Sequence, residues 1–219
     1  MKASVAGWTN DFDYDIGLAA PPTGNNQYGS AAIKMAIMNE DGEQEYEQPT
    51  LYLETYGSEQ GYLYQPAQLH FHTPSEHSVE GKLYDAEMHI VHVAFDGTYN
   101  NKTYNTATAL GDKKYAVYGI FFEELDCEES DSECLASRAA SDKFFEGLAV
   151  FDEAIYVPSN MSFDRETEDP NTKDFLASLV GGQFYSYDGS FTTPPCTEGV
   201  KWTVLRVPAP ISPWNLASM

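Results

Sequence analysis

Short runs of alternating apolar and polar residues recur along the chain. Residues 50–56 (TLYLETY) alternate as a half-buried strand does. Further runs that favour strands, most of them rich in β-branched and aromatic residues, lie at 31–38, 67–72, 86–94 and 114–122. The pattern predicts that a sheet forms the body of the protein.

Helical periodicity is limited to two short segments. It occurs at 135–149 (LASRAASDKFFEGLA) and at 172–180 (TKDFLASLV). Residues 1–30 are rich in Gly, Pro and Asn, which predicts mostly loop. The expected fold class is therefore mostly β (α+β): a single domain over residues 1–219, with a large, mainly antiparallel twisted central sheet and a few short peripheral helices.

The net charge of the chain limits the classes of partner that it can bind. Among 219 residues, 34 are acidic and 12 are basic, which gives a formal net charge of −22. Such a surface repels phosphate backbones and anionic lipid headgroups, and no apolar run approaches the roughly 20 residues that span a bilayer. We therefore expect no nucleic-acid partner and no membrane insertion. A well-solvated exterior accounts for most of the acidity.

Two sequons are compatible with passage through a secretory pathway. They are Asn101-Lys102-Thr103 and Asn160-Met161-Ser162, and both match the N-x-[ST] pattern of glycan acceptors. They are the basis for expecting a secreted glycoprotein located in an extracellular, periplasmic or organelle-lumen compartment.

The cysteines leave two alternatives open. Cys127 and Cys134 bracket the segment EESDSE and can close a short surface loop if the compartment is oxidising. With Cys196 the count is odd, so at least one thiol is unpaired within the chain. The alternative is three reduced thiols.

Two histidine-bearing strands carry the candidate chemistry. Alternation along QLHFHTPSEH (68–77) places Gln68, His70 and His72 on one face of a strand. Alternation along AEMHIVHVA (86–94) does the same for Glu87 and His89. If the two strands pair as antiparallel neighbours, three imidazoles converge at one point.

Three neutral imidazoles with an open fourth position are typical of catalytic zinc sites, whereas structural zinc sites are closed and rich in cysteine. A metal held by uncharged ligands keeps its double charge and lowers the pKa of a bound water to about 7. Gln68 and Glu87 lie two residues before His70 and His89, where each can hold the second ring nitrogen of a ligand. The alternative is that the histidines are hydrogen-bonded structural residues.

Two segments resemble signature regions of a known family. QLHFHTPSEHSVEGKLYDAEMHIVH (68–92) and YSYDGSFTTPPCTEGVKWTVL (185–205) resemble those of the α-class carbonic anhydrases, in a form closer to algal, plant and bacterial members than to animal ones. YAVYGIFF (115–122) resembles the family's central strand. The resemblance implies a zinc enzyme that interconverts carbon dioxide and bicarbonate.

Carried over by position, the resemblance assigns roles to individual residues. It implies that the zinc ligands are His70, His72 and His89, supported by Gln68, Glu87, His77 and Tyr187. Glu76 and Thr192 become a gatekeeping pair, in which a buried carboxylate accepts the threonine proton and the threonine oxygen orients the hydroxide. The carbon dioxide pocket is formed by Val91, Val117, Phe191, Thr193, Val200 and Trp202.

Two details of the resemblance concern the loop after the second signature strand. Phe191 stands where the family more often has leucine, which narrows the mouth of the pocket. The resemblance also implies a cis bond between Pro194 and Pro195.

The sequence also departs from the family. All five histidines lie between 70 and 92, so no proton-shuttle histidine remains, and slower or buffer-dependent turnover is expected. Cys196 stands where many secreted relatives have half of a disulfide, but no cysteine precedes Cys127.

The segments at both ends are short relative to the family. This is consistent with a fragment, one repeat of a longer polypeptide, or a subunit of a larger assembly. The alternative function is an acidic structural or scaffold protein of this fold, in an assembly or mineral matrix, with weak or no activity.

Overall fold

The computed structural model describes residues 2–4, 15–17, 34–38, 51–54, 61–99, 101–111, 114–147, 161–162, 183–217 and 219. The helix predicted at 172–180 and the acceptor of the second sequon, Asn160, lie outside these residues. Most of the predicted N-terminal loop lies outside them as well.

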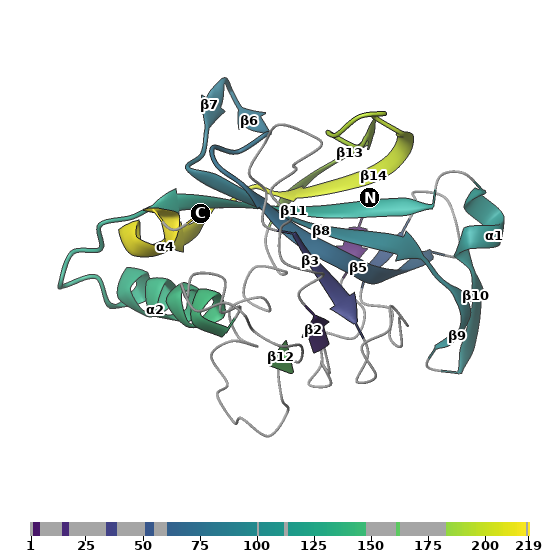
Figure 1. Cartoon of the computed structure of the whole chain (residues 1–219), viewed down its shortest axis with the longest axis horizontal. Coiled ribbons are helices and arrows are strands. Elements are labelled where there is room, and N and C mark those ends of the chain that lie inside the picture. The colour runs from purple at the N-terminus through teal and green to yellow at the C-terminus, as the bar shows by residue number, and fades with distance from the viewer. Residues whose placement is uncertain are drawn as a thin grey trace.

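One large sheet organises the described residues (Figure 1). Its central path runs β12-β2-β3-β5-β8-β11-β14-β13, β4 pairs with β1 and β5, and β15 pairs with β11. The strands are β1 (Lys2–Ser4), β2 (Asp15–Gly17), β3 (Lys34–Met38), β4 (Leu51–Glu54), β5 (Tyr62–His72), β8 (Ala86–Ala94), β11 (Tyr115–Glu124), β12 (Met161–Ser162), β13 (Phe184–Ser190), β14 (Glu198–Leu205) and β15 (Ala209–Ile211).

The expected fold class, a mostly β chain around a large sheet, is confirmed. Neighbouring strands pair antiparallel except that β11 runs parallel to both β14 and β15. A parallel pair needs a long crossover connection, and the chain between β11 and β14 includes the helix α2 (Ser132–Gly147). The predicted helix at 135–149 is thus confirmed, with its start three residues earlier.

Strand β5 is longer at its start than the predicted strand at 67–72. Pro66 lacks a backbone N–H, and the register with β8 shifts between Pro66 and Gln68, as in a β-bulge. The bulge allows β5 to continue past Pro66 although this residue has no N–H group to donate to β8. Beyond it, His70 pairs with His89 and His72 with Glu87.

The two faces of the sheet bury different sets of side chains. On one face, Phe144 and Phe145 of α2 pack into a large cluster with apolar residues of β5, β8 and β11. On the other face, a smaller cluster comprises Val91, Val117, Phe121, Val200, Trp202 and Val204. Figure 1 shows α2 on one side of the sheet and the hairpin of β6 (Ser78–Val79) and β7 (Lys82–Leu83) on the other.

The remaining elements are a second hairpin and two short helices. The hairpin of β9 (Asp96–Tyr99) and β10 (Lys102–Asn105) leads into α1 (Thr106–Leu110), and α4 (Pro213–Ala217) lies near the C-terminus. Among the described residues, no helix is both long enough and apolar enough to cross a bilayer.

A disulfide joins Cys127 to Cys134. It ties the loop after β11 to the first turn of α2, which decides between the two alternatives that the sequence left open. Cys196 is a free, exposed thiol.

His92 is buried on the face of β8 that it shares with Met88 and Ile90, away from the other histidines. Only 4% of the residue is exposed, and its Nδ1–H donates to the backbone oxygen of Ile90 at 2.9 Å. Because burial disfavours the charged imidazolium, the pKa of His92 is lowered to about 4.

This burial predicts a pH dependence of stability. In the unfolded chain His92 binds its proton near the ordinary pKa of about 6.5. The contribution of neutral, buried His92 to the free energy of unfolding is therefore complete above that pH and is lost as the pH decreases toward 4. The loss attributable to His92 is roughly 3 kcal/mol. Urea unfolding across this range should show a shallower loss for His92→Gln than for the unsubstituted protein. The same pH dependence in both proteins would contradict the assignment.

Candidate metal centre

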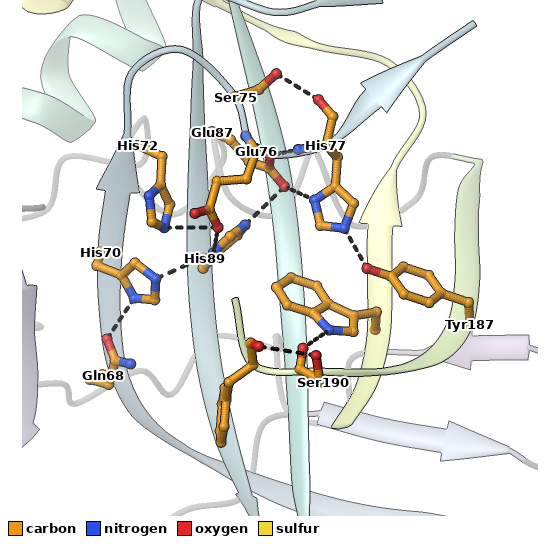
Figure 2. A network of polar contacts seen from close by, with 12 residues as sticks. Gln68, His70, His72, Ser75, Glu76, His77, Glu87, His89, Tyr187 and Ser190 are labelled. Atoms are coloured by element: carbon orange, nitrogen blue, oxygen red, sulfur yellow. Dashed lines mark hydrogen bonds and ion pairs between the residues drawn. The ribbon is translucent and has the colours of Figure 1, made fainter. Parts of the chain in front are cut away.

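The rings of His70, His72 and His89 face one another (Figure 2). His70 and His72 share a face of β5 by alternation, and His89 lies directly opposite His70 on β8. One ring nitrogen from each lies within 4.8 Å of the others. The convergence expected from the sequence is therefore present.

Hydrogen bonds to the outer ring nitrogens leave lone pairs facing inward. The Gln68 Oε1 accepts from His70 Nδ1 at 2.8 Å, and Glu87 Oε1 accepts from His89 Nε2 at 2.9 Å. Because each outer nitrogen donates, the inner atoms are unprotonated in the neutral rings. These inner atoms, His70 Nε2 and His89 Nδ1, are 3.3 Å apart.

His72 supplies the third inward nitrogen. Its Nε2 is buried and has no hydrogen-bond partner among the residues that the structure describes. The nearest carboxylate oxygen, Oε2 of Glu76, is 3.5 Å away, beyond the usual range of about 2.7–3.2 Å for an N–H···O bond. Burial and the neighbouring His89 lower the pKa of His72, which favours the neutral ring.

The donor set fits a zinc ion. Nitrogens bound to one zinc at about 2.0–2.1 Å in tetrahedral geometry lie roughly 3.3 Å apart, close to the separation of the His70 and His89 nitrogens. A buried nitrogen without a partner is costly unless something binds it. His70, His72 and His89 are therefore the described residues best placed to hold a metal.

Glu87 is the buried anchor of the site. Its Oε2 accepts the backbone N–H groups of Glu76 and His77 at 3.0 and 2.9 Å, and its Oε1 accepts from His89 and from His77 Nδ1 at 2.9 and 2.5 Å. Burial alone raises the pKa of Glu87, but the hydrogen bonds from His77 and His89 outweigh it and hold the pKa well below its ordinary range.

His77 supports this anchor and does not face the three inward nitrogens. With Nδ1 donating to Glu87, its Nε2 accepts the Tyr187 hydroxyl at 2.5 Å. Both ring nitrogens of His77 therefore take part in hydrogen bonds. His77, Glu87 and His89 form a second group whose ligand atoms lie close enough together to hold a metal ion. The structure thus brings Tyr187 of β13 into the supporting network.

The expected hydrogen bond between Glu76 and Thr192 is not formed among the described residues. Thr192 is exposed, and the Glu76 side chain is 31% exposed instead of buried. Because the Glu76 backbone is fixed by Glu87, its carboxylate lies beside the imidazoles, 3.5 Å from His72 Nε2 and 4.0 Å from His89 Nδ1. The loop holding Thr192 is closed by its own bonds, including Phe191 N to Thr197 O at 3.0 Å.

The loop after β13 has the expected cis bond between Pro194 and Pro195. A second cis bond, Thr73–Pro74, lies between His72 and Glu76 and has no counterpart in the sequence predictions.

An apolar wall lies beside the imidazoles. The Trp202 ring lies 4.8 Å from the His89 ring, centroid to centroid, and its Nε1–H donates to the Ser190 oxygen at 2.9 Å. Of the other predicted pocket residues, Val91, Val117 and Val200 are buried in the same cluster and Phe191 packs against it. Thr193 is half-buried.

Tyr115 belongs to this wall but was missed from the sequence. Its ring lies 5.0 Å from that of Phe191, and both pack against the cluster of Val117 and Trp202. Tyr115 precedes Val117 by two residues on β11, so alternation alone places the two on one face.

Comparison with known proteins identifies the family of this chain. Residues 19–219 match the family model of the eukaryotic-type carbonic anhydrases. A carbonic anhydrase from Nostoc sp. is 33% identical over 150 residues, which cover 68% of this chain and 44% of that protein. Dioscorin DB3S of Dioscorea polystachya is 32% identical over 150 residues, covering 68% of this chain and 43% of that protein.

Solved structures show the same fold. The α-carbonic anhydrase of Thermovibrio ammonificans, in complex with the inhibitor sulfanilamide, has a TM-score of 0.53 at 22% identity, covering 100% of this chain and 69% of that one. The chain belongs to the eukaryotic-type (α) carbonic anhydrase family. It spans less than half the length of the curated relatives named above.

Proposed function

We propose that this chain is a zinc-dependent carbonic anhydrase that catalyses the reversible hydration of carbon dioxide to bicarbonate and a proton. The observation that carries the proposal is the set of three inward-facing imidazole nitrogens, two of them oriented by Gln68 and Glu87, next to an apolar wall. Membership of the carbonic anhydrase family supports it.

His70, His72 and His89 would hold the zinc. When bound, zinc supplies a hydroxide nucleophile near neutral pH because it lowers the pKa of coordinated water to about 7. Neutral ligands suit this chemistry because they leave the charge of the metal undiminished. Gln68 and Glu87 keep the rings in the tautomers that present a lone pair inward.

The apolar wall would seat the carbon dioxide. The substrate is small and carries no net charge, so a buried apolar surface beside the nucleophile positions it better than hydrogen-bond donors would. Val91, Val117 and Trp202 supply this surface. Tyr115 and Phe191 contact each other and pack at its edge. Glu76 and Thr192 would act as the gatekeeping pair if the loop of Thr192 approaches Glu76.

A second function has its own support. The exposed Thr192, without a hydrogen bond to Glu76 among the described residues, and the net charge of −22 favour an acidic scaffold protein with weak or no activity. Zinc content and catalytic rate separate the two functions, because a scaffold needs neither.

The compartment proposed is extracellular, periplasmic or an organelle lumen. The disulfide between Cys127 and Cys134 supports an oxidising environment, since such bonds rarely persist in a reducing cytosol. We also propose that the protein is secreted and glycosylated, and that the whole protein is a subunit or a repeat of a larger assembly.

Removing one ligand tests the zinc proposal. The purified protein should contain one zinc per chain and accelerate carbon dioxide hydration in stopped-flow measurements. His89→Ala should lose both, with hydration reduced to the uncatalysed rate. His92→Gln is the matched control, because it removes an imidazole from the other face of the same strand and should retain both. Equal zinc content and rate in His89→Ala and the control would overturn the proposal.

The histidine distribution predicts a buffer-dependent rate. His77 uses both ring nitrogens in hydrogen bonds and His92 is buried, so neither is free to carry protons from the site to solvent. The rate at saturating carbon dioxide should therefore rise several-fold with the concentration of an imidazole-type buffer. A high rate that does not change with buffer concentration would show that another group of the chain carries the proton.

A further inference from the structure

A tight turn at the tip of the β9–β10 hairpin carries the first sequon. Lys102 pairs with Tyr99, and Asn101 lies in the turn that leads into β10. Asn101 has a φ of 61°, in the left-handed region that asparagine tolerates better than most residues. Asn101, Lys102 and Thr103 are all exposed. The whole sequon therefore lies on the surface.

The base of the hairpin is held firmly by the body of the protein. The Tyr104 residue is 9% exposed and Thr106 is 2% exposed, and the Thr106 hydroxyl accepts the backbone N–H of Leu63 in β5 at 2.9 Å. The Asp96 carboxylate accepts the Thr108 hydroxyl at 2.6 Å and its backbone N–H at 3.2 Å. A group attached at Asn101 would not disturb these contacts, because none of them involves the turn.

The hairpin lies away from the candidate metal centre and from the helices α2 and α4. Figure 1 shows β9, β10 and α1 at the opposite end of the sheet from α2 and α4. The metal centre is built from β5, β8 and the segment leading to β6. A bulky hydrophilic group on the turn would leave that site open.

We propose that Asn101 is the acceptor of an N-linked glycan. The Asn101 Nδ2 would form a bond to C1 of the first sugar and lose a proton to a base. The bond between C1 and the phosphate oxygen of a lipid-linked oligosaccharide diphosphate would break, and the lipid diphosphate would leave. The inference rests on the proposed compartment and is independent of the zinc chemistry.

The second sequon offers a less favourable setting. Ser162 and Met161 form β12, in which Ser162 pairs with Asp15 and Met161 with Ile16 of β2. Its hydroxyl residue therefore lies inside a strand of the large sheet, whereas Thr103 lies in a two-stranded hairpin at the surface. This contrast favours Asn101 as the modified residue.

Translocation of the full chain into microsomes tests the proposal. The chain, preceded by a secretory leader, is translated in the presence of endoplasmic-reticulum microsomes, and the protease-protected fraction is mapped by mass spectrometry after peptide N-glycosidase treatment in heavy-oxygen water. Asn101 should appear as labelled aspartate. Thr103→Val, which keeps the shape of the side chain but removes the hydroxyl, should abolish the label, and Thr103→Ser should retain it.

Each outcome bears on the assignment. Unmodified Asn101 in protected chains that contain the Cys127–Cys134 disulfide would overturn the proposal, as would a label that persists in Thr103→Val. A label at Asn160 alone would assign the glycan to the second sequon instead. Zinc content measured on the same material reports on the proposed enzyme separately, so that failure of one proposal does not appear as failure of the other.

Discussion

The site depends on one buried carboxylate. Glu87 is fully buried, and burying a charge is tolerable only when hydrogen-bond donors replace the lost water. Two backbone N–H groups and two imidazoles supply these donors. A Cβ at Gly119 of β11 would lie 3.1 Å from Glu87 Oε1, so the glycine leaves room for the carboxylate. The same hydrogen bonds that make the charge tolerable also fix His89 and the segment of Glu76 and His77.

From that anchor, contacts reach strands farther along the sheet. The Tyr187 hydroxyl of β13 donates to His77 Nε2, and Trp202 of β14 lies against both His77 and His89, with ring centroids 4.9 and 4.8 Å away. On the β5 side, Gln68 orients His70. The inward nitrogens are therefore set by strands and buried hydrogen bonds, which hold a ligand geometry more rigidly than loops do.

Local alternation predicts much of this arrangement from the sequence. It places Gln68, His70 and His72 on one face of β5, and the antiparallel pairing with β8 brings His89 to the same point. It does not predict that β5 runs through Pro66, because the bulge depends on pairing with β8. The parallel pairing of β11 with β14 likewise depends on contacts between segments far apart in sequence.

The position of the Glu76 side chain could not be predicted from the sequence. The family resemblance pairs it with Thr192, but the two residues lie in separate loops whose conformations are set by their own hydrogen bonds. Tyr115 was missed for a different reason. Alternation places it on the same face as Val117, but an aromatic residue at that position is equally typical of ordinary core packing.

Hydrogen bonding to Gln68 and Glu87 sets the tautomers of His70 and His89 in advance of metal binding. Nitrogen-15 NMR of the imidazole rings in the metal-free protein at about pH 7 measures this directly. We predict that the protonated outer nitrogen is Nδ1 in His70 and Nε2 in His89, and that these nitrogens stay protonated after zinc is added. A His89 ring protonated at Nδ1, or one that exchanges between both tautomers, would contradict it.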